Sequence, residues 1–160
     1  MAGVLGMGII RTAAIPICLF VLMTGQVYAQ SNRIVLITED EAQLPAPPAS
    51  DLTFRAGISR GPTITLVSPS PSDRNVRSPL RLQLKFEGRG GALVDADSLK
   101  LTYVKNPAVD LTERVKSFSK PDGLDVAEAE LPPGTHTIRA EVKDKDGRSG
   151  FINFNLSIAK

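Results

Sequence analysis

Apolar and polar side chains alternate along the C-terminal part of the chain, which is the pattern of half-buried strands. The first run covers residues 137–143, and its apolar positions are Ile138, Ala140 and Val142. The second run covers residues 152–158, and its apolar positions are Ile152, Phe154, Leu156 and Ile158. Residues 144–150, which are polar and contain two glycines, separate the runs. The pattern predicts an antiparallel β-hairpin.

The same period of two recurs in earlier segments. Its clearest example is residues 80–87, where leucine and phenylalanine alternate with charged and polar side chains. In residues 124–131 the apolar phase changes, which predicts a β-bulge between Ala127 and Glu128. Further strands are predicted at residues 63–67, 99–103 and 115–119. Because proline- and glycine-containing turns separate these segments, about seven strands are expected, and they predict an all-β fold: an antiparallel immunoglobulin-like sandwich with a flexible N-terminal arm.

The predicted arm occupies residues 30–60, and the sandwich domain is predicted for residues 61–160. Residues 34–37 are a short β-prone run, and Thr38 with Glu41 matches a helix capping box. Three prolines follow within residues 44–50 and predict an extended spacer. Two interpretations of the arm stay open: it packs on its own domain, or residues 33–38 add a strand to a partner's sheet and make the protein an assembly subunit.

Residues 1–29 are typical of a secretory signal peptide. Arg11 precedes an apolar run over residues 13–23, and Val27 and Ala29 suit cleavage before Gln30. The run is about half as long as a bilayer span needs, so we expect no stable membrane anchor after cleavage. Cys18 lacks the small neighbours of a lipidation site. We therefore predict an exported protein, periplasmic or secreted.

Composition narrows the chemistry of the mature chain. Cys18, the only cysteine of the whole sequence, lies in the predicted signal peptide, so cleavage leaves no disulfide and no thiolate ligand. Without Arg11, 18 of the 19 basic residues face 17 acidic ones, a net charge of +1 with no long runs of one sign. This balance gives no electrostatic footprint for nucleic acid. Because Trp is absent and only one Tyr follows Gln30, a carbohydrate platform is not expected either.

Four segments resemble the bacterial immunoglobulin-like and fibronectin-type-III-like modules of exported proteins. They are residues 61–69 (GPTITLVSP), 80–87 (LRLQLKFE), 131–138 (LPPGTHTI) and 142–147 (VKDKDG). The resemblance covers roughly residues 60–159 and implies a fold more than a function.

A second resemblance concerns the periplasmic copper-carrier sandwich proteins. The shared segments are residues 68–73 (SPSPSD), the Pro-Gly-Thr corner and the Asp-Gly turn before the last strand. In that family copper is bound by a histidine at the mature N-terminus and by another beside the Asp-Gly turn. Here Gln30 or Ser31 and Arg148 stand at those places, so the copper ligands are missing. His136, the only histidine, is expected to bond nearby backbone at the corner before its strand rather than to be a ligand or a catalytic group.

Calcium is the metal that the remaining residues favour, because it binds hard oxygen ligands. Asp95 and Asp97 precede one predicted strand, and Asp144 and Asp146 lie in the hairpin loop. The two loops share one end of an immunoglobulin-like sandwich, so four carboxylates can converge there. The alternative is that these residues serve their turns through local backbone bonds.

We expect a non-catalytic interaction or accessory module of the cell envelope, binding an unidentified envelope protein or polymer. The chain has no nucleophile elbow, phosphate-binding glycine loop or zinc-protease motif, so no enzymatic activity and no catalytic residue are predicted. The predicted working surface is the loop end formed by residues 88–97 and 144–149, with Arg89, Asp146 and Arg148 as candidate contacts. A calcium-handling sandwich protein is the alternative function.

Overall fold

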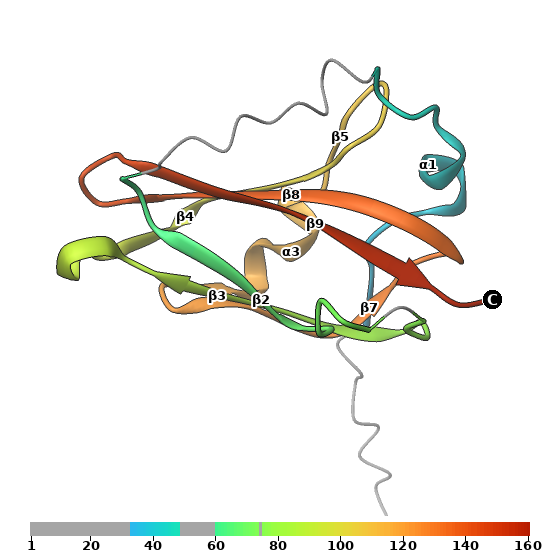
Figure 1. The fold of residues 1–160 in the computed structure, drawn as a ribbon, viewed down its shortest axis with the longest axis horizontal. Helices are drawn as coiled ribbons and strands as arrows, with labels where there is room; N and C mark the ends of the chain where they lie inside the picture. The colour runs from blue at the N-terminus through green and yellow to red at the C-terminus, as the bar shows by residue number, and fades with distance from the viewer. Residues whose placement is uncertain (1–32, 49–59, 74) are drawn as a thin grey trace, which may run out of the picture. The chain divides into compact units, whose positions relative to one another are not determined.

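The computed structural model describes residues 33–48, 60–73 and 75–160, so the predicted signal peptide lies outside the described residues. Two sheets form stacked layers (Figure 1). In the first sheet the order is β1 (Arg33–Val35), β7 (Gly123–Glu130), β3 (Leu80–Glu87) and β2 (Thr63–Ser68), and β6 (Ser119–Lys120) also pairs with β7. In the second the order is β5 (Val109–Asp110), β4 (Val94–Tyr103), β8 (Gly134–Asp144) and β9 (Ser149–Ile158). The predicted all-β sandwich is confirmed.

The helical segments are short. They are α1 (Glu39–Gln43), α3 (Thr112–Val115) and the 3-10 turns η1 (Arg89–Gly91) and η2 (Lys116–Phe118). Within the part of the chain that is described, no helix is long and apolar enough to cross a membrane.

The core lies between the two layers, where the alternating apolar positions of both sheets meet. In β3 every second residue is buried, from Leu80 to Phe86, while the residues between them face outward. Leu101, Ile138 and Leu156 contribute from the second sheet. Period-two patterning therefore decides which face of each strand enters the core.

Two local predictions are confirmed by the strand registers. β8 and β9 form one long antiparallel hairpin, from Gly134 opposite Ile158 to Lys143 opposite Ser149. In β7, Val126 lies opposite Leu82 and Ala129 opposite Leu80, so β7 has one residue more than β3 between these pairs. This is the bulge that the change of phase predicted, and it keeps Val126 and Ala129 buried on the same face.

The strand count and one segment differ from prediction. Nine strands are present among the described residues rather than about seven, and β1 pairs with β7 in parallel. Residues 115–119, predicted as an edge strand, are instead the end of α3, the turn η2 and the first residue of β6. Val115 is fully buried at the end of α3, and the Thr112 hydroxyl of that helix accepts a hydrogen bond from Leu101 N at 3.1 Å. Contacts with β4 and the core thus decide the secondary structure of this segment, because its apolar pattern alone also suits a strand.

Residues 33–48 are part of the folded unit rather than a free arm. β1 pairs with β7, and Leu36 and Ile37 directly after it are 0% and 1% exposed in the core. The Leu36 and Ile37 amides both donate to Glu130 O, at 2.9 and 3.4 Å. The packing therefore favours the interpretation that this segment belongs to its own domain, since donating it to a partner would remove two core side chains.

Helix α1 completes this attachment. The predicted capping box is present, because Glu41 N donates to Thr38 Oγ1 at 3.3 Å and Thr38 N donates to Glu41 Oε2 at 2.9 Å. Arg114 of α3 donates to both carboxylate oxygens of Glu41, at 2.8 and 2.6 Å, and to Leu36 O at 2.8 Å. Hydrogen bonds from Arg114 lower the pKa of Glu41 to about 2.

Candidate interaction surface at the loop end

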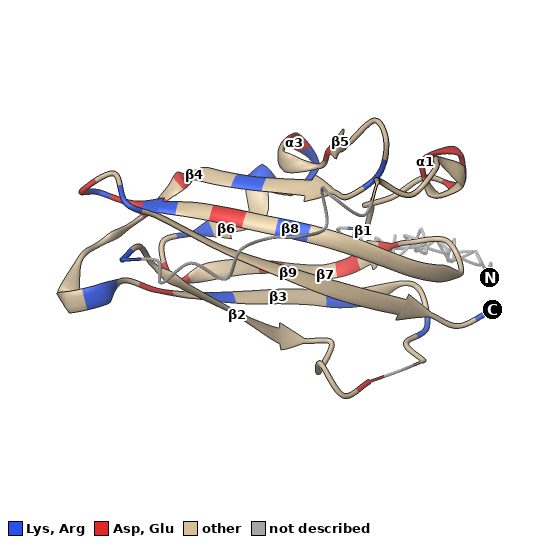
Figure 2. Ribbon diagram, turned by 45° about the horizontal axis from the view of Figure 1, so that its top comes forward, with Lys and Arg blue, Asp and Glu red and all other residues tan. Residues whose placement is uncertain are grey.

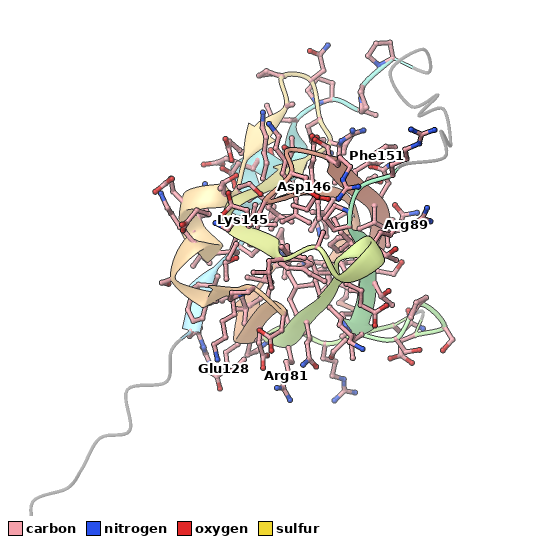
Figure 3. The ribbon with its side chains drawn as sticks, turned by 90° about the vertical axis from the view of Figure 1, so that its left-hand side faces the viewer. Arg81, Arg89, Glu128, Lys145, Asp146 and Phe151 are labelled. Atoms are coloured by element: carbon pink, nitrogen blue, oxygen red, sulfur yellow. The ribbon has the colours of Figure 1, made fainter. Side chains whose placement is uncertain are left out.

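The two predicted working loops meet at one end of the sandwich. Val94 pairs with Asp144 and Asp95 with Lys143, so the loop that leads into β4 lies beside the turn between β8 and β9. Lys145 N donates to Leu93 O at 2.9 Å and joins the loops directly. Figure 3 looks onto this end, where Arg89, Lys145 and Asp146 are labelled.

The β8–β9 turn is built around Asp144, whose side chain is 0% exposed. Its Oδ1 accepts from Asp146 N at 3.0 Å and from Arg148 N at 2.8 Å, and its Oδ2 accepts from Arg148 Nε at 2.8 Å. Burial raises the pKa of Asp144, but the bonds and charge of Arg148 outweigh burial and leave this pKa below its ordinary value. Arg148 also pairs with Asp146. Gly147 has φ +80°, a conformation that favours glycine.

The other side of this end is a large bulge inside β4, so Asp95 and Asp97, which were predicted to precede a strand, lie within one. Between Asp95 and Lys100 the register with β8 shifts, because five steps along β4 match two steps along β8. The Ser98 hydroxyl bridges the bulge, since it donates to Asp95 O at 2.6 Å and accepts from Lys143 N at 2.8 Å. The Asp95 carboxylate pairs with Lys145 Nζ at 3.2 Å, and Asp97 is exposed.

The four aspartates of the calcium prediction therefore lie at the same end, but basic side chains accompany three of them. Arg148 contacts Asp144 and Asp146, and Lys145 contacts Asp95. Within residues 33–48, 60–73 and 75–160, no group of three or more His, Cys, Asp or Glu side chains could hold a metal ion. The arrangement suits a rigid turn, and calcium binding stays a prediction from the sequence.

The loop end exposes one large apolar side chain. Leu93 is 72% exposed, more than Val35 or Val67, and its backbone is held by the bond from Lys145. Arg89 lies nearby in sequence, in the turn η1, and is exposed. Residues 88–97 were predicted as part of the working surface, but the exposure of Leu93 was missed. Its hydrophobicity in a polar loop was the available signal.

His136 lies in the core, 2% exposed, and both of its ring nitrogens are hydrogen-bonded. Nε2 lies 2.8 Å from Pro132 O and Nδ1 lies 2.9 Å from the Tyr103 hydroxyl. Because a carbonyl can only accept, the ring proton is assigned to Nε2, and Nδ1 accepts from Tyr103. The backbone bond at the corner agrees with the predicted structural role, whereas the bond from Tyr103 was not foreseen.

The neutral His136 ring gives the fold a pH-dependent stability. Burial lowers the pKa of His136 below its ordinary value of 6.5. The hydrogen bond to Pro132 O opposes this shift, and the charge of Lys105 adds to it. Below pH 6.5 the unfolded chain therefore binds a proton that the folded chain does not, so the free energy of unfolding should fall as the pH drops from 6.5 toward the folded-state pKa. Urea unfolding at pH 7.5 and at pH 5.5 measures this loss.

The control for this pH dependence is His136→Gln, which cannot titrate and should lose little stability over the same interval. Glu41 does not interfere, because its contribution is lost only below its ordinary pKa of 4.5, as the pH falls toward about 2. Equal slopes in the wild type and in His136→Gln would contradict the assignment.

Comparisons with known proteins do not assign the chain to a family. No protein-family model matches the chain, and neither a curated protein nor a solved structure matches it. The resemblance to immunoglobulin-like and fibronectin-type-III-like exported modules therefore stays an expectation from the sequence.

Proposed function

We propose that the chain is an exported, non-catalytic binding module of the cell envelope, whose working surface is the loop end around Leu93. The observation that carries this proposal is the exposure of Leu93 on a loop that is hydrogen-bonded to the rigid Asp144 turn. Because the Leu93 backbone is already held in place, burying its exposed side chain against a partner would cost less ordering entropy than burying one on a free loop.

The charges around Leu93 suit the rim of such an interface. Arg89 is exposed, and the Lys145 and Asp146 side chains are 61% and 64% exposed. Exposed charges of this kind influence association rate and partner choice more than affinity. A partner surface with an apolar pocket and polar surroundings would complement this end.

The order of the strands supports an immunoglobulin-like module as the scaffold. β2, β3 and β7 are neighbours in one sheet, and β5, β4, β8 and β9 are neighbours in the other. Lettered along the chain, these sheets have the orders A-B-E and C′-C-F-G, which suit an immunoglobulin-type sandwich. Such scaffolds commonly place binding residues on the loops at one end.

A photo-crosslinking side chain at Leu93 tests this function in intact cells. We expect one adduct of defined mass at this position, and none from the same side chain at Ala127, which is exposed on β7. Arg89→Glu combined with Lys145→Glu should weaken the adduct at Leu93, because the rim charges are reversed. The chain recovered from the adduct should begin at Gln30 if export includes cleavage.

Equal labelling from Leu93 and Ala127, or no adduct from either position, would refute the proposed surface. A chain that retains residues 1–29 in the cytoplasm would instead refute export and leave the surface open to a partner there.

A further inference from the structure

β2 is an edge strand of one sheet and β9 is an edge strand of the other, and neither carries a charged residue. The gap between these two edges is called the seam. β2 (TITLVS) and β9 (SGFINFNLSI) contain no Lys, Arg, Asp or Glu, whereas β3, β4, β7 and β8 each contain several. Figure 2 shows β2 and β9 without coloured bands, unlike the strands inside the sheets. Exposed sheet edges usually carry charges that prevent pairing with other chains. Here the inner strands of the sheets carry charged residues, and the edge strands β2 and β9 have none.

The outer edge of β9 has unpaired backbone groups. At its C-terminal end Val76 N donates to Ser157 O at 3.0 Å, and Ala159 N donates to Val76 O at 2.8 Å, so these residues direct their backbone groups away from β8. Backbone direction alternates along a strand, so Phe151, Asn153 and Asn155 direct theirs the same way. Within the described ranges, no strand pairs with β9 at these three positions.

A groove of about 380 Å³ lies between β2 and this stretch of β9. Its apolar lining comes from Ile64, Leu66, Pro71, Ile152 and Phe154. The Oδ1 atom of Asn153, another lining residue, is buried and has no hydrogen-bond partner. A buried acceptor without a partner costs stability, so the side chain of Asn153 is not satisfied by the groove wall itself.

Chain segments close the groove at both ends. At one end, a Cβ atom on Gly150 would lie 1.8 Å from Pro62 O, so β2 and β9 begin in close contact. At the other end Val76 occupies the β9 edge beside Ile158. Residues 151–155 therefore form a window of about 13 Å at the usual rise of a strand, which admits a short segment of about five residues.

We propose that this seam binds, by strand addition to β9, a short extended segment of a partner protein with uncharged, alternately apolar residues. Backbone groups of the segment would pair with Phe151, Asn153 and Asn155, and alternate side chains would enter the groove toward Leu66. The uncharged lining disfavours a charged segment, because its charges would be desolvated without partners. The window is also too short for the ten-residue β9 edge of a second copy. The proposal concerns a different surface from the Leu93 loop end and does not depend on it.

Residue-resolved hydrogen exchange of the purified full chain tests the seam. The probe is the five-residue peptide acetyl-Thr-Val-Thr-Val-Thr-amide, which matches the window. Its control is the same peptide N-methylated at all five residues, which offers β9 no residue N–H donor in either strand direction. In the free protein the amides of Phe151, Asn153 and Asn155 should exchange fast, while those of Ile152 and Phe154, which face β8, are protected. The peptide should protect the first three, and the N-methylated peptide should bind about tenfold more weakly or worse.

A matched pair of variants distinguishes strand addition from nonspecific binding of the peptide. Ile152→Lys places a charge in the half-buried apolar lining of the groove and should weaken peptide binding at least about tenfold, whereas Ala127→Lys on the exposed face of β7 should not change it. No saturable binding, equal binding of both peptides, or equal effects of the two lysines would overturn the proposal. Protection of the three amides by concentration-dependent dimerisation without peptide would also overturn it, in favour of a second copy.

Discussion

Leu36→Ala should lower the free energy of unfolding by about 2–5 kcal/mol and the thermal midpoint by several degrees or more. Leu36 is 0% exposed, and its amide is bonded to Glu130 O of the neighbouring strand at 2.9 Å. Removing its side chain loses transfer free energy and leaves a cavity that α1 and β7 can close only in part. Urea or thermal unfolding of the purified protein measures the change.

The matched control is Val35→Ala, one residue earlier on the same segment. Val35 is 49% exposed, so its truncation should cost less than about 1 kcal/mol. A large difference between the two variants means that residues 33–48 are part of this domain's own core. Similar small losses would mean that the segment is dispensable to the fold, and would restore the interpretation of a strand available to a partner.

His136→Ala should lower the free energy of unfolding by about 3 kcal/mol or more. The substitution empties a fully buried site and removes the partner of the Tyr103 hydroxyl and of Pro132 O. Tyr103 is 1% exposed, so no solvent replaces the lost bond without rearrangement of the core. Chemical unfolding at pH 7.5, where His136 is neutral, gives the comparison.

Tyr103→Phe serves as the control for the hydrogen bond alone. It keeps the ring and its packing, so it should cost about 1–2 kcal/mol, and the double variant should cost less than the sum of the single ones because the two side chains share one bond. Full additivity would show that the Tyr103–His136 bond does not contribute to stability. A loss under about 1 kcal/mol for His136→Ala would contradict its structural role.

Structural features that follow from a fixed period of apolar residues could be predicted well from the sequence. The β8–β9 hairpin, strand β3 and the bulge in β7 follow from which positions are apolar, because one sheet face is buried and the other is solvated. The capping box of α1 was also predictable, because its two hydrogen bonds join residues three apart in the sequence. These features depend on local geometry alone.

Features that join distant segments were not predictable in the same way. Leu36 and Ile37 suit a loose tether as well as a core strand, and only pairing with β7 decides between them. Residues 115–119 have a pattern that suits a strand, but the anchoring of α3 on β4 makes residues 115–118 helical. At the loop end, Asp144 was predicted as a possible calcium ligand, whereas the nearby Arg148 makes it the centre of a turn.

The sequence by itself determined the class of the fold, the main strands and the residues that face the core, because alternation along each strand is a local property of the chain. It also determined that residues 30–160 contain no cysteine, and that no histidine stands beside the Asp-Gly turn before the last strand. Only the tertiary structure decided that residues 33–48 join the core, that His136 pairs with Tyr103, and that the uncharged strands β2 and β9 flank one groove. Each of these depends on segments distant in the chain meeting in space, and periodicity contains no information on which segments meet.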